Sequence, residues 1–399
     1  MNIDVSRKSI LTILHSNYLK NNAGIEKVVL EQQNICMDLG ITFISVFPLI
    51  NVLKIGSHHI YIKTGKYALI IDGKLKGYYI FAKLKEIINK INLEAVIIHQ
   101  LMGYKHNNCL IKFIKSFVCP IYYYIHDYST ICYNNVLLKN NKVYCGCSRI
   151  SLRKCYNCRF FVLGLIDHQF YKNLFNKCET IQFVFPSNTI KKIWLDVFGD
   201  KYKNKCRVIP NEKFSDEVYE LNKDTKFEKI RIAYIGYQNI VKGWESFKKI
   251  NNINKDQFEL FVLGRCTEQL EGVKVIPVSF IDNGPNAMVN AIKDNNIDIA
   301  FLWSIRPETY GFTFYESYIS GTYIITNNNS GNITYMTKKL NCGKSFESDI
   351  ELFDFLSDFN CLKNELKDYY GKNTTRSCEM IANDEIFSLF QVNTGDSIE

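Results

Sequence analysis

The sequence predicts an α/β protein built from two doubly wound domains that face each other across a cleft. Short runs of β-branched and apolar residues alternate with helical patterns, which is typical of parallel sheets whose strands are joined by crossover helices. The runs are almost continuously apolar, as expected for strands covered on both faces. With 399 residues, 47% of them hydrophobic and 22% charged, the chain is globular and too long for one ordinary core.

Strands are expected in both halves of the chain, each followed by a helical pattern. In the first half they are expected at residues 10–16, 42–47, 95–100, 120–127 and 181–187, and in the second half at 230–237, 258–265, 273–280, 297–304 and 322–327. The first crossover helix is expected to begin at Gly24 and to end at Gly40. Ser187 or Asn188 can cap another helix near the end of the first half.

Three segments follow from this pattern. We expect a first domain at 1–200, with a cysteine-containing insertion at about 132–160, and a second domain at 201–375. Residues 376–399 are expected to form a C-terminal helix or tail.

The formal net charge of +9 comes from scattered basic residues. A nucleic-acid binder usually shows a concentrated basic stripe and a known motif, and neither is present, so no nucleic-acid partner is expected. The charge fits attraction to anionic ligands, peripheral contact with an anionic membrane surface, or simply a solvated surface. The first residues do not resemble a signal peptide, and no stretch approaches ~20 apolar residues, so a cytoplasmic protein is expected.

Two loops between a strand and a helix have features of anion sites. Gly24 opens a helix after the polar loop that follows the first strand, and backbone N–H groups at such a position can approach a phosphate. Lys242 lies in the corresponding loop of the second half, where it can meet a phosphate as a point charge. A tight turn and a solvated lysine are the plain alternatives.

Two acids stand out in the run "WSIRPETYGFTFYESYIS". Glu308 is expected in the loop at the carboxyl end of a strand, and Glu316 about one turn into the next helix. Both can then face the crevice where doubly wound sheets bind ligands. Carboxylates accept hydrogen bonds from the hydroxyl pairs of a sugar or ribose. His126 ends another strand and is a further site candidate, although a structural histidine is a common alternative.

A cysteine cluster lies in the expected insertion. The chain has 14 cysteines, which favours free thiols or a metal site over a disulfide framework. The candidate ligands of a structural zinc are Cys145, Cys147, Cys155 and Cys158, with Cys132 upstream. Reduced thiols in a lid-like insertion are the alternative.

Together these segments resemble the retaining nucleotide-sugar glycosyltransferases of family 4, also known as glycosyl transferases group 1. That family has the GT-B architecture of two facing Rossmann-like domains, which implies that the helix or tail at 376–399 returns to the first domain. The resemblance is strongest over about residues 180–330, in "VFPSNTIKKIWLDVFG", "IAYIGYQNIVKGWESF", "FVLGR" and "SIRPETYGFTFYESYISGTYIIT". "NNAGIEKVV" and "YYYIHDYSTIC" match more loosely in the first half.

The resemblance implies roles at the matching positions. Glu316 would hold the nucleotide ribose, Glu308 would contact the donor sugar, and Lys242 would contact the diphosphate. Gly24 would approach the donor phosphates, and His126 would lie near the transferred sugar. The backbone beside the sugar and diphosphate would come from three consecutive residues, Tyr310, Gly311 and Phe312.

The chain departs from the family at two positions. Tyr237 stands where relatives usually carry an arginine, so half of the cationic clamp on the diphosphate is missing, and Arg306 or Arg265 could replace it. Ala23 stands where a second glycine is common.

The resemblance implies transfer of a sugar from a nucleotide-diphosphate donor to a glycan or lipid-linked saccharide, with retention of configuration. No catalytic cofactor or metal is expected. The Lys-, Asn- and Ile-rich composition suggests a bacterium, and hence O-antigen, capsule or exopolysaccharide synthesis at the cytoplasmic face of the inner membrane. The alternatives are a nucleotide-sugar epimerase on the same fold, a non-catalytic GT-B binding or assembly subunit, and a cysteine-metal module that binds a partner.

Overall fold

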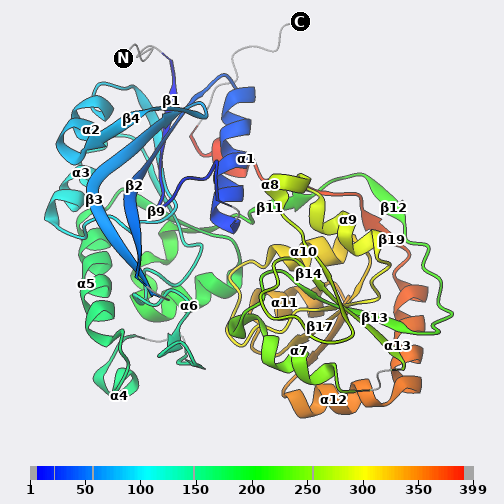
Figure 1. The fold of residues 1–399 in the computed structure, drawn as a ribbon. Coiled ribbons are helices and arrows are strands. Elements are labelled where there is room, and N and C mark those ends of the chain that lie inside the picture. Colours follow the sequence, from blue (N-terminus) through cyan, green and yellow to red (C-terminus); the bar gives the residue numbers. More distant parts are fainter. Residues whose placement is uncertain (1–6, 22, 56–57, 147–148, 254–255, 391–399) are drawn as a thin grey trace, which may run out of the picture.

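The computed structural model describes residues 7–21, 23–55, 58–146, 149–253 and 256–390. Two lobes lie side by side, and each has a central, mostly parallel sheet with helices on both faces (Figure 1). The predicted α/β class and the two-domain arrangement are therefore confirmed. All ten expected strands are present near their predicted positions.

The sheet of the first domain is built around strand β1. Its described strands, in spatial order, are β10 (Cys206–Val208), β9 (Ile181–Phe185), β6 (Ile121–Tyr124), β5 (Leu93–Ile98), β1 (Ser9–Ile13), β2 (Thr42–Ile55), β3 (His58–Ile71) and β4 (Lys74–Ile80). Strand β1 pairs in parallel with β2 on one side and with β5 on the other. Strand order therefore reverses at β1, which places a ligand crevice beyond its carboxyl end.

Strands β3 and β4 extend this sheet with two antiparallel hairpins that were not expected from the sequence. Val46 of β2 pairs with Leu69 of β3, and Ala68 of β3 pairs with Tyr78 of β4. Lysine and glycine residues interrupt the apolar runs of both strands, so neither shows the long apolar run from which the other strands are predicted.

Helices cover both faces of the first sheet. They are α1 (Gly24–Asp38), α2 (Phe81–Ile88), α3 (Asn108–Lys115), α5 (Phe161–Lys177) and α6 (Asn188–Phe198), with a 3₁₀ turn η1 (Asp200–Lys205) before β10. Ser187 caps α6, because its side chain accepts a hydrogen bond from the backbone of Ile190. The insertion after β6 holds a small hairpin, β7 (Leu138–Lys139) and β8 (Val143–Tyr144), and the short helix α4 (Leu152–Cys155).

The second sheet has the strand order of a dinucleotide-binding domain. Its described strands, in spatial order, are β15 (Val273–Ile276), β14 (Phe258–Leu263), β13 (Ile230–Ile235), β16 (Ile299–Phe301), β17 (Tyr323–Asn327) and β18 (Gly343–Phe346). All pairs are parallel, and the order reverses between β13 and β16. Its helices and turn are η2 (Ile240–Lys242), α7 (Trp244–Ile250), α8 (Phe280–Asn283), α9 (Ala287–Asp294), α10 (Phe312–Ile319), α11 (Asn332–Lys339), α12 (Asp349–Ser357) and α13 (Phe359–Lys372).

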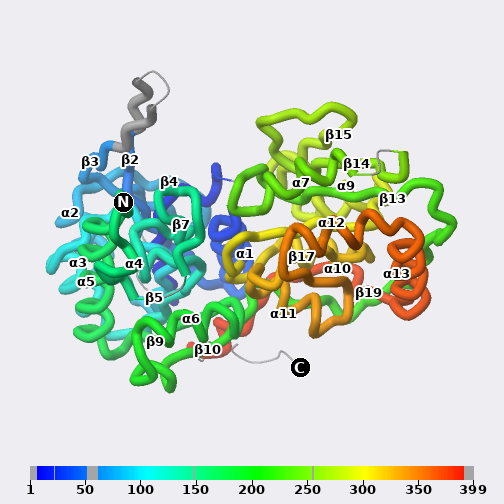
Figure 2. Tube along the Cα trace, turned by 90° about the horizontal axis from the view of Figure 1, so that it is seen from below, coloured from blue at the N-terminus to red at the C-terminus, as the bar shows by residue number. Residues whose placement is uncertain are grey.

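The end of the chain crosses back to the first domain (Figure 2). Two antiparallel strand pairs guide it, β12 (Val218–Glu220) with β19 (Thr375–Ser377) and β11 (Glu212–Phe214) with β20 (Met380–Ala382). In the short helix α14 (Glu385–Ser388), Ile386 is fully buried in the first domain's core. The ring of Phe390 lies 5.1 Å from that of Tyr122 on β6. The two domains therefore share a core segment besides the 209–229 connection.

Among the described residues, every helix is too short or too polar to cross a bilayer.

Candidate functional site

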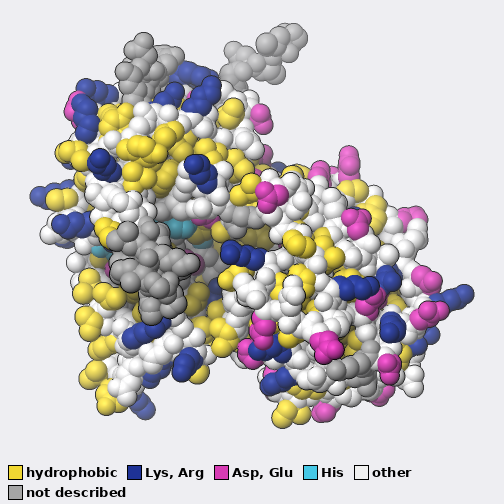
Figure 3. Space-filling view, in the orientation of Figure 1, with side chains coloured by type: hydrophobic (Ala, Val, Ile, Leu, Met, Phe, Trp, Pro, Cys, Tyr) yellow, Lys and Arg dark blue, Asp and Glu magenta, His cyan; other side chains and the backbone are white. Residues whose placement is uncertain are grey.

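A cavity of about 490 Å³ lies between the two sheets, at the carboxyl ends of their strands. Its walls come from the loops after β1, β5 and β6 in the first domain and after β13 and β16 in the second. The cavity is lined by all eight residues singled out for donor binding or catalysis, namely Gly24, His126, Lys242, Glu308, Tyr310, Gly311, Phe312 and Glu316. Figure 3 shows a hollow between the lobes with histidine side chains at its base. We refer to this cavity as the cleft; its volume is in the range of small-molecule sites.

The Glu308 carboxylate is surrounded by hydrogen-bond donors and positive charge. Ser304 Oγ donates a hydrogen bond to Glu308 Oε1 at 3.1 Å, and Arg306 Nη2 lies 3.8 Å from the same oxygen. Burial opposes ionisation, but the charges of Arg306 and Lys242 and the bond from Ser304 outweigh it, so the pKa of Glu308 lies below its ordinary value. Glu308 is therefore an ionised acceptor at neutral pH.

The backbone of Glu308 is fixed by the loop after β17. The Glu308 N–H donates to Ser330 O at 3.1 Å, and the Asn332 N–H donates to Glu308 O at 3.0 Å. Gly331 between them has φ +67°, and a Cβ there would lie 2.7 Å from the Glu308 nitrogen. Only glycine suits both the left-handed conformation and this close approach. The sequence reasoning missed this loop, although "NNNSGN" after a strand is a turn signal.

Of the two arginines that could supply the charge missing at Tyr237, only Arg306 lines the cleft. Arg306 lines the cleft, with its side chain 14% exposed and its guanidinium 5.7 Å from the Tyr128 ring. Arg265 instead lies 5.8 Å from the ring of Tyr237, which is half exposed. Lys242 also lines the cleft, near Gly236. Two cations, Lys242 and Arg306, thus line the cleft with Glu308.

Glu316 belongs to a group of three carboxylates around one lysine at the domain boundary. Lys27 of α1 pairs closely with Glu212 of β11, lies 3.9 Å from Glu31 and sits 4.9 Å from the centre of the Phe312 ring. Burial raises the pKa of Glu316 to about 7, opposed by Lys27 and helped by Glu212. Burial and Glu212 likewise raise the pKa of Glu31 to about 7, against the pull of Lys27. One positive charge cannot neutralise three acids, so part of the group holds protons.

His126 is part of a buried chain of side chains that the sequence reasoning did not find. His126 Nε2 lies 2.8 Å from His99 Nδ1, and His99 Nε2 lies 3.0 Å from Gln32 Oε1. Because Gln32 Nε2 donates to the Tyr124 hydroxyl at 3.3 Å, its Oε1 accepts from His99 Nε2–H. His99 Nδ1 then accepts from His126 Nε2–H, which leaves His126 Nδ1 as an acceptor. His99 directly follows β5 and His126 comes two residues after β6, a parallel visible in "IIHQ" and "YIHD".

Both histidines are neutral at physiological pH. Burial lowers the pKa of His126 to about 3, with His15 adding to the effect. Burial also lowers the pKa of His99, and the neighbouring His126 contributes. His126 can therefore act as a neutral hydrogen-bonding group in the cleft, not as a cation.

The domains are held together across the cleft by hydrogen bonds to one loop. Thr309 Oγ1 donates to His126 O at 2.6 Å, Ser187 Oγ donates to Thr309 O at 2.6 Å, and the Tyr128 hydroxyl donates to Pro307 O at 2.8 Å. Glu308 lies between these contacts. The loop that carries Glu308 is therefore positioned by the first domain as well as the second.

The start of α1 faces the cleft beside Phe312. Gly24 is the first residue of α1, and Ala23 before it provides no side-chain cap for the first N–H groups. A Cβ on Gly24 would lie 2.9 Å from the Phe312 ring, so a larger residue there would require that ring to move. The uncapped N–H groups and the helix dipole suit an anion.

Polar atoms without partners remain around the cleft. In the described part of the chain, Glu26 Oε2, Asn211 Oδ1 and Arg306 Nε are buried without a hydrogen bond. All three residues line the cleft. Such groups are rare in folded proteins and are common where a polar ligand binds.

The described cysteines of the predicted zinc cluster lie together in the insertion and do not line the cleft. Cys145, Cys155 and Cys158 line a small cavity together with Cys132, while Cys147 lies outside the described residues. Burial raises the pKa of Cys132 to about 11, and the other three thiols contribute to the shift. Among the described residues, no three His, Cys, Asp or Glu side chains are close enough to hold a metal ion. Cys132, expected upstream of the cluster, thus lies beside Cys145, Cys155 and Cys158.

A pH-dependent stability is expected from Glu31 and Glu316. Their pKa values are raised from about 4.5 to about 7 in the folded state, so the stabilisation from their protons is complete below about pH 4.5 and is lost as pH rises through 7. Glu316→Gln should therefore melt a few degrees above wild type at pH 8 and at the wild-type temperature at pH 4.5, by scanning fluorimetry. Glu271→Gln on the exposed surface is the control. An equal difference at both pH values would contradict the assignment.

Gly331→Ala tests the fixation of Glu308. The added Cβ meets the Glu308 backbone at a left-handed residue, so we expect a destabilisation of about 1–3 kcal/mol and weaker ligand binding in the cleft. Gly371→Ala in α13 is the matched control, because no atom lies within 4 Å of the added carbon. Chemical denaturation measures both. If the two variants have the same stability, Gly331 is not constrained as described.

Comparisons with known proteins establish the fold. No protein-family model matches the chain, and no curated protein matches it in sequence. Among solved structures, the glycosyltransferase WaaG, involved in lipopolysaccharide biosynthesis, superposes with a TM-score of 0.55 at 11% identity, covering 91% of this chain and 94% of WaaG. Anabaena HepE in complex with UDP and glucose gives 0.53 at 12% identity over 91% and 92%, and a glycosyltransferase from Rickettsia africae gives 0.51 at 13% over 92% and 93%. The chain therefore has the GT-B architecture of two facing Rossmann-like domains.

Proposed function

We propose that this protein is a retaining glycosyltransferase of family 4 that uses a nucleotide-diphosphate sugar as donor. The observation that carries the proposal is the ionised Glu308, which lines the cleft together with Lys242 and Arg306 between two strand-order reversals. These three side chains belong to the second domain, and the first domain lines the cleft opposite them with Gly24 and His126. The similar HepE structure holds UDP and glucose, which makes UDP the first nucleotide to test.

The donor would lie with its diphosphate at the positive side of the cleft. Lys242 and Arg306 would bind the phosphate oxygens, and the N–H groups at the start of α1 would approach them from the first domain. Glu316 would accept hydrogen bonds from the ribose hydroxyls, and Glu308 from the sugar hydroxyls. Arg306 would thereby supply the positive charge that Tyr237 does not.

The bond between the anomeric carbon and the diphosphate oxygen would break first, with oxocarbenium character on the sugar. Lys242 and Arg306 would stabilise the charge that develops on the leaving oxygens. The acceptor hydroxyl would attack from the face on which the diphosphate leaves. Its proton would pass to a phosphate oxygen of the leaving group, and the new bond would keep the anomeric configuration.

The neutral state of His126 fits a position beside the sugar. A neutral imidazole next to developing positive charge avoids the repulsion of an imidazolium. The chain through His99 and Gln32 would hold its tautomer, so that Nδ1 accepts a hydrogen bond from a sugar hydroxyl. The hydrogen bond from Thr309 to the His126 carbonyl would hold the imidazole ring at a fixed position relative to Glu308.

The net charge and the composition support a proposal for the acceptor and the setting. We propose a glycan or lipid-linked saccharide acceptor in bacterial surface polysaccharide synthesis, O-antigen, capsule or exopolysaccharide, with the protein at the cytoplasmic face of the inner membrane. The structural zinc at the cysteine cluster stays a prediction, which elemental analysis of the purified protein would test.

The function is tested first with ligands and then with variants. A thermal-shift screen of nucleotide sugars identifies the donor, because only ligands that bind the folded state raise the midpoint. With that donor, Glu308→Gln and Lys242→Ala should each lower the rate of nucleoside diphosphate release about 10²–10³-fold, the usual effect of removing one transition-state contact.

Lys249→Ala is the control, because this lysine is exposed on α7 and pairs with Asp349. All variants should keep the wild-type circular dichroism spectrum. Wild-type rates in Glu308→Gln and Lys242→Ala would remove the assignment. If the enzyme forms an epimerised sugar from the donor alone, without an acceptor, its activity is that of an epimerase and not of a transferase.

A further inference from the structure

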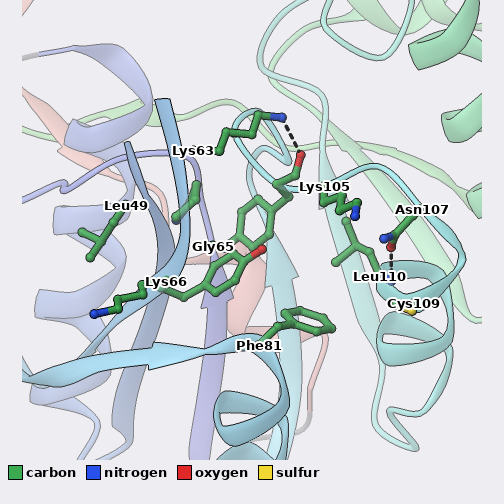
Figure 4. A pocket seen from close by; sticks show the side chains of 13 residues that line it. Leu49, Lys63, Gly65, Lys66, Phe81, Lys105, Asn107, Cys109 and Leu110 are labelled. Carbon is green, nitrogen blue, oxygen red and sulfur yellow. Dashed lines mark hydrogen bonds between the residues drawn. The ribbon is translucent and has the colours of Figure 1, made fainter. Parts of the chain in front are cut away.

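A second cavity, of about 480 Å³, lies in the first domain outside the cleft. Figure 4 shows it between strands β2 and β3 on one side and the segment that leads into α3 on the other. Its walls are mainly apolar and aromatic. The apolar lining comes from Leu49, Tyr67, Phe81, Tyr104 and Leu110. We call it the lateral pocket.

The aromatic walls of the lateral pocket are rigid. The rings of Tyr67 and Tyr104 stack at 5.2 Å with 28° between their planes, and the Phe81 ring lies 5.6 Å from Tyr67. The Tyr104 hydroxyl donates to Val46 O of β2 at 2.9 Å. The pocket is thus preformed, which lowers the entropic cost of binding.

Positive charge surrounds the lateral pocket without opposing charge. Lys63, Lys66 and Lys105 line it, and none of them forms an ion pair with a residue that the structure describes. In Figure 4, Lys63 lies at the upper rim and Lys105 on the opposite wall, while Lys66 extends away. Lys63 Nζ donates to Tyr104 O at 3.0 Å, so it is held in place at the rim. The segments 39–71 and 95–126, which form most of the pocket, contain no Asp or Glu.

Exposed apolar side chains continue from the lateral pocket onto the surface. Ile50 is 36% exposed and lies against Gly103 of the pocket wall, where a Cβ would be 3.0 Å from Ile50 Cδ1, and the neighbouring Met102 is 41% exposed. Figure 3 shows hydrophobic side chains gathered on this lobe, over the antiparallel strands, with basic residues at the margins. A long apolar group that leaves the pocket would therefore still meet apolar surface.

One loop forms the wall between the lateral pocket and the cleft. In this loop after β5, Gln100 and Met102 line the cleft, whereas Gly103 and Tyr104 line the lateral pocket. Gly103 has φ +86°, and a Cβ there would lie 2.8 Å from Pro48 Cγ, so the loop is packed directly against β2. A molecule in the lateral pocket would thus be one loop away from Glu308 and His126.

We propose that the lateral pocket binds the lipid phosphate that carries the acceptor sugar. This inference rests on the proposed function and names its acceptor class. The chain next to the phosphate would lie against Tyr67, Phe81 and Leu110. The phosphate would be bound by Lys63 and Lys105, and the sugar beyond it would pass Met102 into the cleft.

The chemistry of the pocket favours this ligand over others. A nucleotide would leave its hydroxyls without acceptors, because no carboxylate lines the pocket. A bilayer surface is met by a convex or flat patch, whereas this site is a concave pocket. Separate apolar and cationic parts match an amphiphile with a single charged head.

The test measures binding of a soluble probe, farnesyl phosphate, by calorimetry without donor. Farnesyl phosphate should bind at least tenfold more tightly than farnesol or inorganic phosphate, because only it uses both parts of the site. Lys63→Ala/Lys105→Ala and the filling variant Cys109→Trp should each weaken binding at least tenfold. Lys112→Ala/Lys115→Ala, which removes the same charge from exposed positions on α3, should bind like wild type.

Several results would overturn the proposal. Equal effects of the two double variants, or no binding of farnesyl phosphate, would do so. Recruitment to phosphatidic acid vesicles that depends on Lys63 and Lys105, without farnesyl phosphate binding, would identify a membrane-docking face instead. UDP binding, measured in the same proteins, separates this inference from the proposed function. The lateral-pocket variants should bind UDP as wild type does. A wild-type protein that does not bind UDP would count only against the transferase.

Discussion

The arrangement of the cleft depends on one carboxylate, Glu308, held between two cations by a loop that is fixed from both sides. The second domain holds its backbone through Ser330 and Asn332, and the first domain holds the next residue through the contact of Thr309 with His126. Without the nearby positive charges, burial would protonate Glu308 and remove its capacity as an acceptor. The charge of Glu308 therefore depends on cations of its own domain, and its position depends also on contact with the first domain.

The two acids of the cleft have opposite electrostatic environments. Glu308 lies near Arg306 and Lys242 and has a lowered pKa, while Glu316 shares Lys27 with two further carboxylates and has a pKa of about 7. One acid is ready to accept hydrogen bonds at neutral pH, and the other gains its charge over the physiological range. Environments that separate the pKa values of paired acids are typical of functional sites. A ligand that brings hydroxyl donors to Glu316 would favour its ionised form.

The parts of the structure that follow from local pattern could be predicted from the sequence, and the parts that depend on distant contacts could not. The buried strands and the positions of Glu308 and Glu316 after β16 were visible as apolar runs and loop signals. Strands β3 and β4 were missed because lysine and glycine residues interrupt their apolar runs. Gly331, His99 and the Lys27 cluster act through partners far away in the chain, which no single stretch reveals. The choice between Arg306 and Arg265 likewise needed coordinates.

The central claim is that Lys242 and Arg306 form a diphosphate site beside Glu308. Calorimetric titration of uridine, UMP and UDP into wild type and into Lys242→Ala/Arg306→Ala tests it most directly. The account predicts that UDP binds wild type at least tenfold more tightly than uridine and that the double variant loses this preference while still binding uridine. Equal affinities of wild type for uridine and UDP, or an unchanged preference in the double variant, would contradict it.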